Sequence, residues 1–153
     1  MLLQFLTGGA VSVCNIIIHA LVMLLVVRVA QSVSARNLGQ PPFLLVGVMV
    51  STVVVLMLAH AIEVCVWSLA YSLVQLAPAD KSQLYFAFVN YTTLGYGDIT
   101  PVAKWQLLGP ITAMNGVLLF GWSTAVIFEV LRRTLQPRLL PEAEGIASAD
   151  VTP

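Results

Sequence analysis

The sequence predicts an all-α membrane protein, and three observations lead to this fold class. Hydrophobic residues make up 59% of the 153 residues and charged residues only 9%, whereas a soluble domain carries about 25% charged residues. Three apolar segments are each long enough to cross ~30 Å of hydrocarbon as a helix. A shorter apolar segment and a glycine-rich run lie between the second and third of them.

The first domain, residues 1–40, is predicted to hold a transmembrane helix and a cytoplasmic linker. Its apolar segment, Ala10–Ala30, has no Lys or Arg before it, unlike a signal peptide. Arg28 and Arg36 lie at or after its end, which places that end in the cytoplasm and the N-terminus outside. We expect this additional helix to pack against the lipid-facing side of the next one.

The second domain, residues 41–133, contains two further long helices and a short one. The outer helix is predicted over 43–77, because Pro41-Pro42 suits a helix start. The segment 82–92 is too short to span the membrane, and Ser82 is a suitable N-cap for a half-helix. The inner helix is predicted over 105–133.

The arginines support this topology independently. All of them lie on the cytoplasmic side if the inner helix ends at Arg132 and Arg133, which puts the C-terminus inside. Residues 134–153 carry three prolines and three acidic residues, so we predict a short disordered tail. No soluble ligand-binding domain and no nucleic-acid partner are expected.

The most informative motif is Thr-Thr-Leu-Gly-Tyr-Gly-Asp at residues 92–98. Gly95 and Gly97 can adopt a positive φ, which L-residues avoid. Alternating such residues with ordinary ones lets successive backbone carbonyls face the same side. Thr93 can add its hydroxyl to that column of oxygens. Rings of these oxygens can replace the hydration shell of a cation.

This run resembles the selectivity filter of the potassium-channel family, with Leu94 where the family usually has Val or Ile. The resemblance extends from about Phe43 to Arg133. It implies a pore helix over 82–92, a filter over 93–98 and a homotetramer with one pore on its fourfold axis. It implies K⁺ ligands on one strand per chain: the carbonyls of Thr93, Leu94, Gly95 and Tyr96 and the Thr93 hydroxyl, with Gly97 at the outer turn.

The same resemblance implies which residues support the filter. Tyr85 and Phe86 hold two aromatic positions of the pore helix, and Tyr85 is expected to bond Asp98. Val89 occupies a position that is acidic in some members, so Asp98 has no carboxylate partner there. Thr92 joins the pore helix to the filter. The Tyr96 ring is expected to pack outward against the pore helix as a spacer.

His60 and Glu63 lie one turn apart in the outer helix, where ionisable residues are costly and often functional. Three interpretations remain open: a structural pair, a pH or gating role, and a metal site. A metal site needs more ligands, and His19 is the only other histidine.

Gly116 and Gly121 in the inner helix allow two interpretations, a gating hinge or close helix packing. Thr112, Asn115 and Thr124 face either a cavity or a neighbouring helix. Cys14 and Cys65 lie in separate apolar segments, so we expect buried, unpaired thiols.

The sequence therefore predicts a potassium-selective channel of the cell membrane that conducts K⁺ passively, with no cofactor other than the ions in its filter. No nucleophile–base constellation or phosphate loop is present, so an enzyme is not expected. Two alternatives remain: a non-conducting sensor or assembly protein with the channel fold, and a weakly selective cation channel.

Overall fold

The structure, a computed structural model, describes residues 1–36, 42–78 and 80–149, without side chains at 33–36, 42, 44 and 136–149. Residues 37–40 of the predicted linker and residues 150–153 of the predicted tail lie outside the described ranges. The described chain is helical, as its composition predicts. It consists of four α-helices and one 3₁₀ turn: α1 Leu2–Arg36, α2 Pro42–Val74, α3 Gln83–Tyr91, the turn Ala103–Trp105 and α4 Leu108–Ala149.

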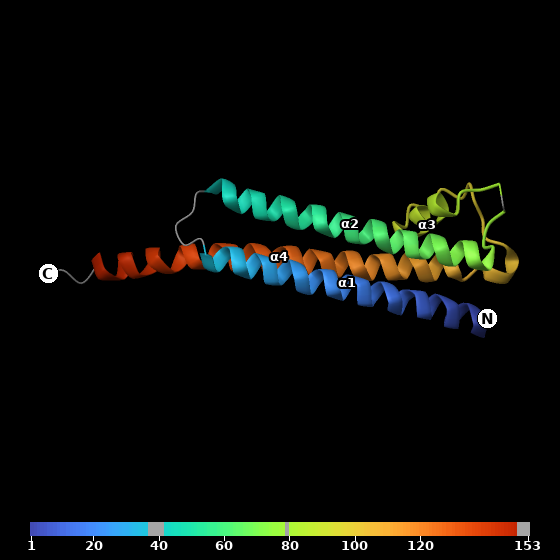
Figure 1. The fold of residues 1–153 in the computed structure, drawn as a ribbon, viewed down its shortest axis with the longest axis horizontal. Helices are drawn as coiled ribbons and strands as arrows, with labels where there is room; N and C mark the ends of the chain where they lie inside the picture. The colour runs from blue at the N-terminus through green and yellow to red at the C-terminus, as the bar shows by residue number, and fades with distance from the viewer. Residues whose placement is uncertain (37–41, 79, 150–153) are drawn as a thin grey trace.

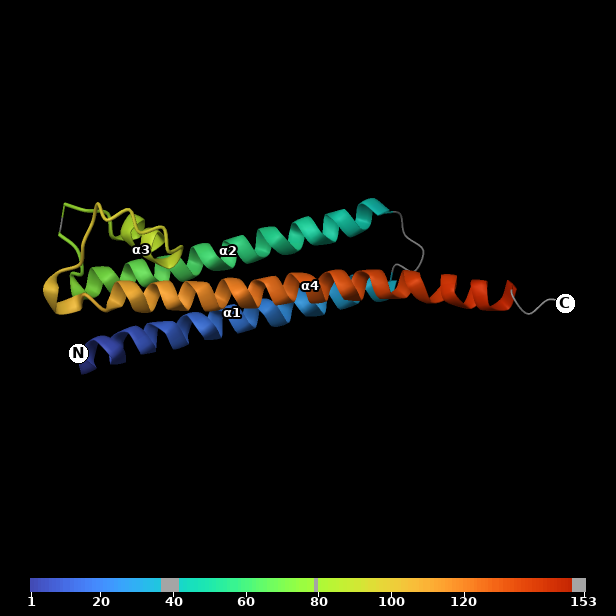
Figure 2. The same ribbon diagram turned by 180° about the vertical axis from the view of Figure 1, so that it is seen from behind.

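The three long helices lie side by side, and short α3 lies beside one end of the bundle (Figures 1 and 2). The N-terminus lies at the α3 end, and the C-terminal part of α4 extends beyond the opposite end (Figure 1). Helix α1 contacts both α2 and α4. The expected contact of α1 with the outer helix is present, and α1 also packs on α4, because its polar side chains find partners on both neighbours.

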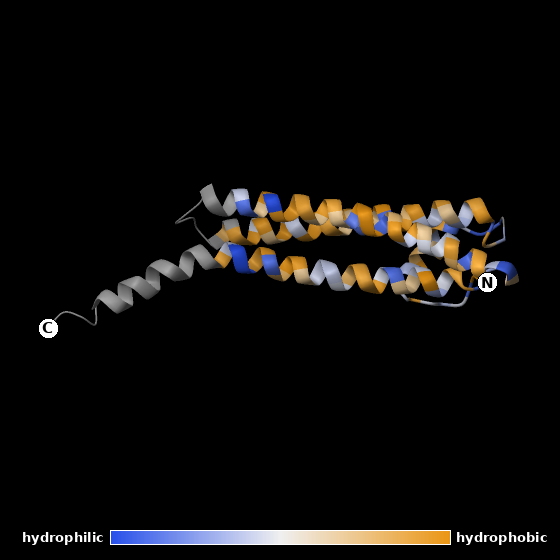
Figure 3. Ribbon diagram, turned by 90° about the horizontal axis from the view of Figure 1, so that it is seen from below, coloured by the Kyte–Doolittle hydropathy of each residue, from blue (hydrophilic) through white to orange (hydrophobic). Residues whose placement is uncertain are grey.

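The three long helices are apolar enough to cross a membrane over Leu2–Ser32, Leu45–Val74 and Ala103–Leu135. Hydrophobic residues cover most of their length (Figure 3). Helix α1 begins at Leu2, well before the predicted start at Ala10, and it continues through Gly8 and Gly9. A Cβ built on Gly8 would lie 2.9 Å from the Ile111 side chain, so α1 packs closely on α4 here. The Leu107 amide donates to Gln4 Oε1 over 2.9 Å, which holds the start of α1 against the start of α4.

Helix α2 ends at Val74, three residues before the predicted boundary. Gln75 adopts a left-handed φ of 53°, and the Leu76 amide donates to the Tyr71 carbonyl over 3.0 Å. This is a Schellman motif without glycine. The Leu76 carbonyl accepts the Val102 amide over 2.9 Å, which closes the segment that contains α3.

Helix α4 begins at Leu108 instead of 105, because Trp105 belongs to the 3₁₀ turn and Pro110 fits a first helical turn. It continues to Ala149, whereas the sequence predicted disorder from residue 134. The prediction of disorder rested partly on the prolines of this segment. The Leu, Glu and Ala residues between those prolines are strong helix formers, which explains why the helix continues. On α4, Glu129 pairs with Arg132 and Arg133.

The two cysteines are free, as predicted. Both are exposed on the isolated chain, so the expectation of burial is wrong. Cys14 and Cys65 lie on faces of α1 and α2 that turn away from the bundle, where an apolar thiol needs no partner within the chain.

Helices α3 and α4 pack closely at Gly116. A Cβ built on Gly116 would lie 2.1 Å from the Tyr91 carbonyl oxygen, whereas one on Gly121 meets nothing within 4 Å. For Gly116 the structure therefore favours close packing over a hinge. A hinge at Gly121 stays a prediction.

We predict that Gly116→Ala destabilises the folded protein by about 1–3 kcal/mol, because the new methyl group overlaps the backbone of α3. Thermal unfolding of the purified protein in detergent measures the effect. Gly121→Ala on the same helix is the matched control. Equal melting temperatures for the two variants would contradict the packing.

Candidate functional site: the glycine loop and the buried polar layer

Helix α3 has the capping that its sequence predicts. The Ser82 hydroxyl accepts the Tyr85 amide over 3.2 Å, which confirms the N-cap. At the other end the Thr92 amide donates to the Phe88 carbonyl over 3.0 Å. The helix spans Gln83–Tyr91, so the predicted boundaries 82 and 92 are its two caps.

Residues 92–98, here called the glycine loop, follow α3 directly. Thr93, Gly95 and Gly97 have φ values of 61°, 58° and 77°, and they alternate with Leu94 and Tyr96. The sequence predicted this conformation for the two glycines but not for Thr93, since a β-branched residue rarely adopts it. An alternation of this kind lets successive backbone carbonyls face the same side.

Hydrogen bonds to α3 hold the start of the loop. The Val89 carbonyl accepts the Leu94 amide over 2.9 Å and the Gly95 amide over 3.4 Å. The Thr93 amide donates to the Asn90 carbonyl over 3.0 Å. The carbonyls at the end of α3 therefore fix the backbone of the loop. Val89 supports the loop through its main-chain carbonyl, and its side chain is buried.

Side chains of the loop are exposed in the single chain, with Leu94 at 53% and Tyr96 at 67%. The Tyr96 ring is thus not covered within its own chain.

The Asp98 carboxylate accepts a hydrogen bond from the Tyr85 phenol, which raises the pKa of that phenol above its usual value. Phe86 instead is buried and packs against Tyr71, with ring centroids 5.6 Å apart.

A second contact holds α3 near its C-terminal end. The Tyr71 phenol and the Thr112 hydroxyl lie 2.6 Å apart, and the Asn90 side-chain amide donates to the Tyr71 oxygen over 3.3 Å. Helices α2, α3 and α4 are joined here by polar contacts. Thr112 therefore faces a neighbouring helix, one of the two arrangements that the sequence allowed.

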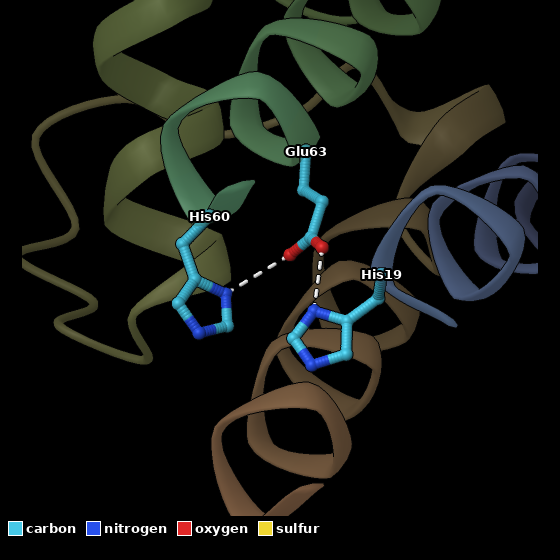
Figure 4. Close-up of side chains that lie close together, drawn as sticks. All are labelled: His19, His60 and Glu63. Atoms are coloured by element: carbon cyan, nitrogen blue, oxygen red, sulfur yellow. Dashed lines mark hydrogen bonds and ion pairs between the residues drawn. The ribbon is translucent and has the colours of Figure 1, made fainter. Parts of the chain in front are cut away.

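A buried polar layer lies deeper in the bundle, between two apolar clusters. Its centre is the Glu63 carboxylate of α2. His19 Nδ1 lies 2.8 Å from Glu63 Oε1, and His60 Nδ1 lies 2.9 Å from Oε2 (Figure 4). The Tyr91 phenol donates a hydrogen bond to Oε2. His19 and Glu63 have no exposed side-chain surface, and His60 has 15%.

Helix α4 completes the layer through Ser123. The Ser123 Oγ lies 3.0 Å from His60 Nε2 and 3.3 Å from His19 Nε2. Each of the four helices thus contributes a side chain to one connected network. The last residue of α3, Tyr91, belongs both to this network and to the chain segment that enters the glycine loop.

Further polar contacts extend the layer toward the α3 end. The Asn15 side-chain amide donates to the Glu63 carbonyl over 3.2 Å and to Asn115 Oδ1 over 3.3 Å. Trp67 Nε1 donates to the same Asn115 oxygen over 3.0 Å. Asn115 is buried against neighbouring helices, whereas Thr124 is exposed and donates to the Phe120 carbonyl of its own helix.

Sequence reasoning paired His60 with Glu63, and the structure contains that contact. It missed the contributions of His19, Tyr91 and Ser123. A signal existed for α1, because Asn15 and His19 lie four residues apart on one face of an otherwise apolar helix. Among the described residues, His19, His60 and Glu63 bring potential metal-binding atoms within 4.8 Å of one another.

Comparison with known families adds one finding. Residues 43–133 match the sequence model of a family described as "Ion channel". No curated protein and no solved structure matches the chain. The matched segment covers more than half of the chain and contains most of α2, all of α3, the glycine loop and the membrane-spanning part of α4. Passive ion conduction is the function that this match suggests, and the protein, whose described residues include three helices apolar enough to span a membrane, belongs to the ion channel family.

Proposed function

We propose that this protein is a potassium-selective channel in which four copies of the glycine loop surround one axis. The observation that carries the proposal is the alternation of positive φ at Thr93, Gly95 and Gly97 within the channel-family segment. Such a backbone presents a column of oxygens, and rings of backbone carbonyls can replace the hydration shell of K⁺.

The ion ligands in this proposal are the carbonyls of Thr93, Leu94, Gly95 and Tyr96 and the Thr93 hydroxyl. Gly97 makes the outer turn. K⁺ ions are the only cofactors that the function requires. Neighbouring ions in the column repel one another, which keeps throughput high although each site is dehydrated.

Exposure of the loop supports a homotetramer. Leu94 and Tyr96 are exposed in the single chain, and a loop of irregular backbone is tolerated at membrane depth only inside protein or beside water. Neighbouring subunits supply that cover. One chain provides one side of a carbonyl ring, so a closed cyclic assembly completes it.

The fold also supports an orientation in the cell membrane. The N-terminus and the glycine loop lie at the same end of the bundle (Figure 1). Arg28, Arg132 and Arg133 lie toward the opposite ends of their helices, so the positive-inside rule makes that side cytoplasmic. The C-terminal end of α3 then directs partial negative charge to the cavity below the loop and stabilises a cation there.

Specific features favour each of two alternatives. Leu94 in place of the usual Val or Ile favours a weakly selective cation channel. The buried polar layer favours a non-conducting membrane sensor. Reversal potentials in K⁺ and Na⁺ gradients, measured on the reconstituted protein, separate all three functions.

We predict that Gly95→Ala abolishes potassium flux, because an L-residue resists a φ of 58°. Rubidium uptake into proteoliposomes measures this loss. Gly47→Ala in α2 is the matched control, since its Cβ meets nothing within 4 Å and its backbone φ is ordinary. Unchanged, still selective uptake by Gly95→Ala would refute the proposed ion pathway.

We further predict that Tyr91→Phe lowers stability by about 1–3 kcal/mol, because Glu63 loses a buried hydrogen-bond donor. The K⁺ over Na⁺ selectivity should fall with it, since Tyr91 anchors the end of α3. A double-mutant cycle with Glu63→Gln measures the coupling in thermal unfolding. Strictly additive effects of the two substitutions would show that the Tyr91–Glu63 contact has no role.

A further inference from the structure

We propose that His19, His60 and Glu63 form a binding site for one divalent transition-metal ion per chain, of the class represented by Zn²⁺. The ligand atoms are Nδ1 of each histidine and an oxygen of the Glu63 carboxylate. The Tyr91 phenol oxygen lies beside them, 2.9 Å from His60 Nδ1, and is available as a fourth ligand atom. This site does not depend on which ion the channel conducts.

The spacing of the ligand atoms is close to what a tetrahedral site needs. Zn–N and Zn–O bonds of about 2.0–2.2 Å place the ligand atoms of a tetrahedron about 3.3 Å apart. In the structure each Nδ1 lies 2.8 or 2.9 Å from a Glu63 oxygen, and the three donors lie within 4.8 Å of one another. A tetrahedral ion therefore requires the short contacts to lengthen by about 0.5 Å and the longest separation to shorten by at most about 1.5 Å.

Hydrogen-bond counting favours an ion between the two histidines. An ionised carboxylate only accepts, so both Nδ1 atoms must carry hydrogen when they bond Glu63 directly. Both neutral rings then present an Nε2 lone pair to Ser123, whose hydroxyl has a single hydrogen. One Nε2 is left unpaired unless the cluster takes up an additional proton.

A metal ion removes this mismatch. With the ion on both Nδ1 atoms, each neutral ring carries its hydrogen on Nε2 instead. Both Nε2–H groups then donate to Ser123 Oγ, whose two lone pairs accept them at the observed 3.0 and 3.3 Å. Ser123 thereby fixes the tautomer and the orientation of both rings, as outer-shell partners of metal-binding histidines do.

Charge and surroundings agree with this class of ion. Two imidazole nitrogens and one carboxylate suit Zn²⁺ and related metals better than Mg²⁺ or Ca²⁺, which prefer oxygen ligands. Glu63 is the one acidic side chain in the layer, so it supplies the anion that a cation in an apolar bundle requires. In the single chain, His60 has 15% of its side chain exposed, whereas His19 and Glu63 have none.

Isothermal titration of the EDTA-treated, full-length protein in detergent with ZnCl₂ tests the proposal. We expect saturable binding of one ion per chain, and Co²⁺ should give the visible absorption of a tetrahedral site with nitrogen and oxygen ligands. His19→Gln and His60→Gln should each weaken binding at least about tenfold, and Ser123→Ala should weaken it about 10- to 100-fold.

The control variant is the double substitution Cys14→Ser and Cys65→Ser, which removes the only thiols of the chain and should leave Zn²⁺ binding unchanged. Circular dichroism establishes that each variant is folded. The proposal is overturned if the folded protein binds no Zn²⁺, because the cluster would then bind protons and no metal ion. It is also overturned if His19→Gln and His60→Gln bind Zn²⁺ as tightly as the parent protein. Zn²⁺ binding is measured without ion flux. A failure of the metal-site proposal can therefore be distinguished from a failure of the proposed potassium selectivity.

Discussion

The buried Glu63 carboxylate is the constraint around which the helices of this protein are arranged. An ionised group in an apolar bundle is costly unless it is fully hydrogen-bonded. Its partners come from three helices, with His19 on α1, His60 on α2 and Tyr91 on α3. Ser123 on α4 then bonds both histidines. The position of α1 follows, because only a helix that touches both α2 and α4 can bring His19 to this point.

The polar layer also connects the helix bundle to the glycine loop. Tyr91 ends α3, and its phenol bonds Glu63 while the next residues begin the loop. Gly116 lets α4 pack directly on the Tyr91 carbonyl. The Val89 carbonyl in turn accepts two amides of the loop. Local strain, as at Thr93 with its positive φ, persists where the surrounding structure fixes the backbone this firmly.

Much of this structure could be predicted from the sequence, and the failures have physical reasons. Helix number and the caps of α3 follow from hydropathy and from Ser82, which are local signals. The contact between His60 and Glu63 is also local, since the residues lie one turn apart. His19 lies 44 residues from Glu63 in the sequence. No local sequence pattern predicts which faces of two separate helices pack together. The length of α4 was underestimated because the prediction relied on the prolines of the tail and gave too little weight to the strong helix formers between them.

An experimental density map of the assembled protein in K⁺ would decide most directly whether the glycine loop lines an ion pathway. The expected result is a fourfold assembly with a column of ion density on its axis, bounded by the carbonyls of residues 93–96. A monomer, or an oligomer in which Gly95 and Tyr96 lie away from any shared axis, would contradict it.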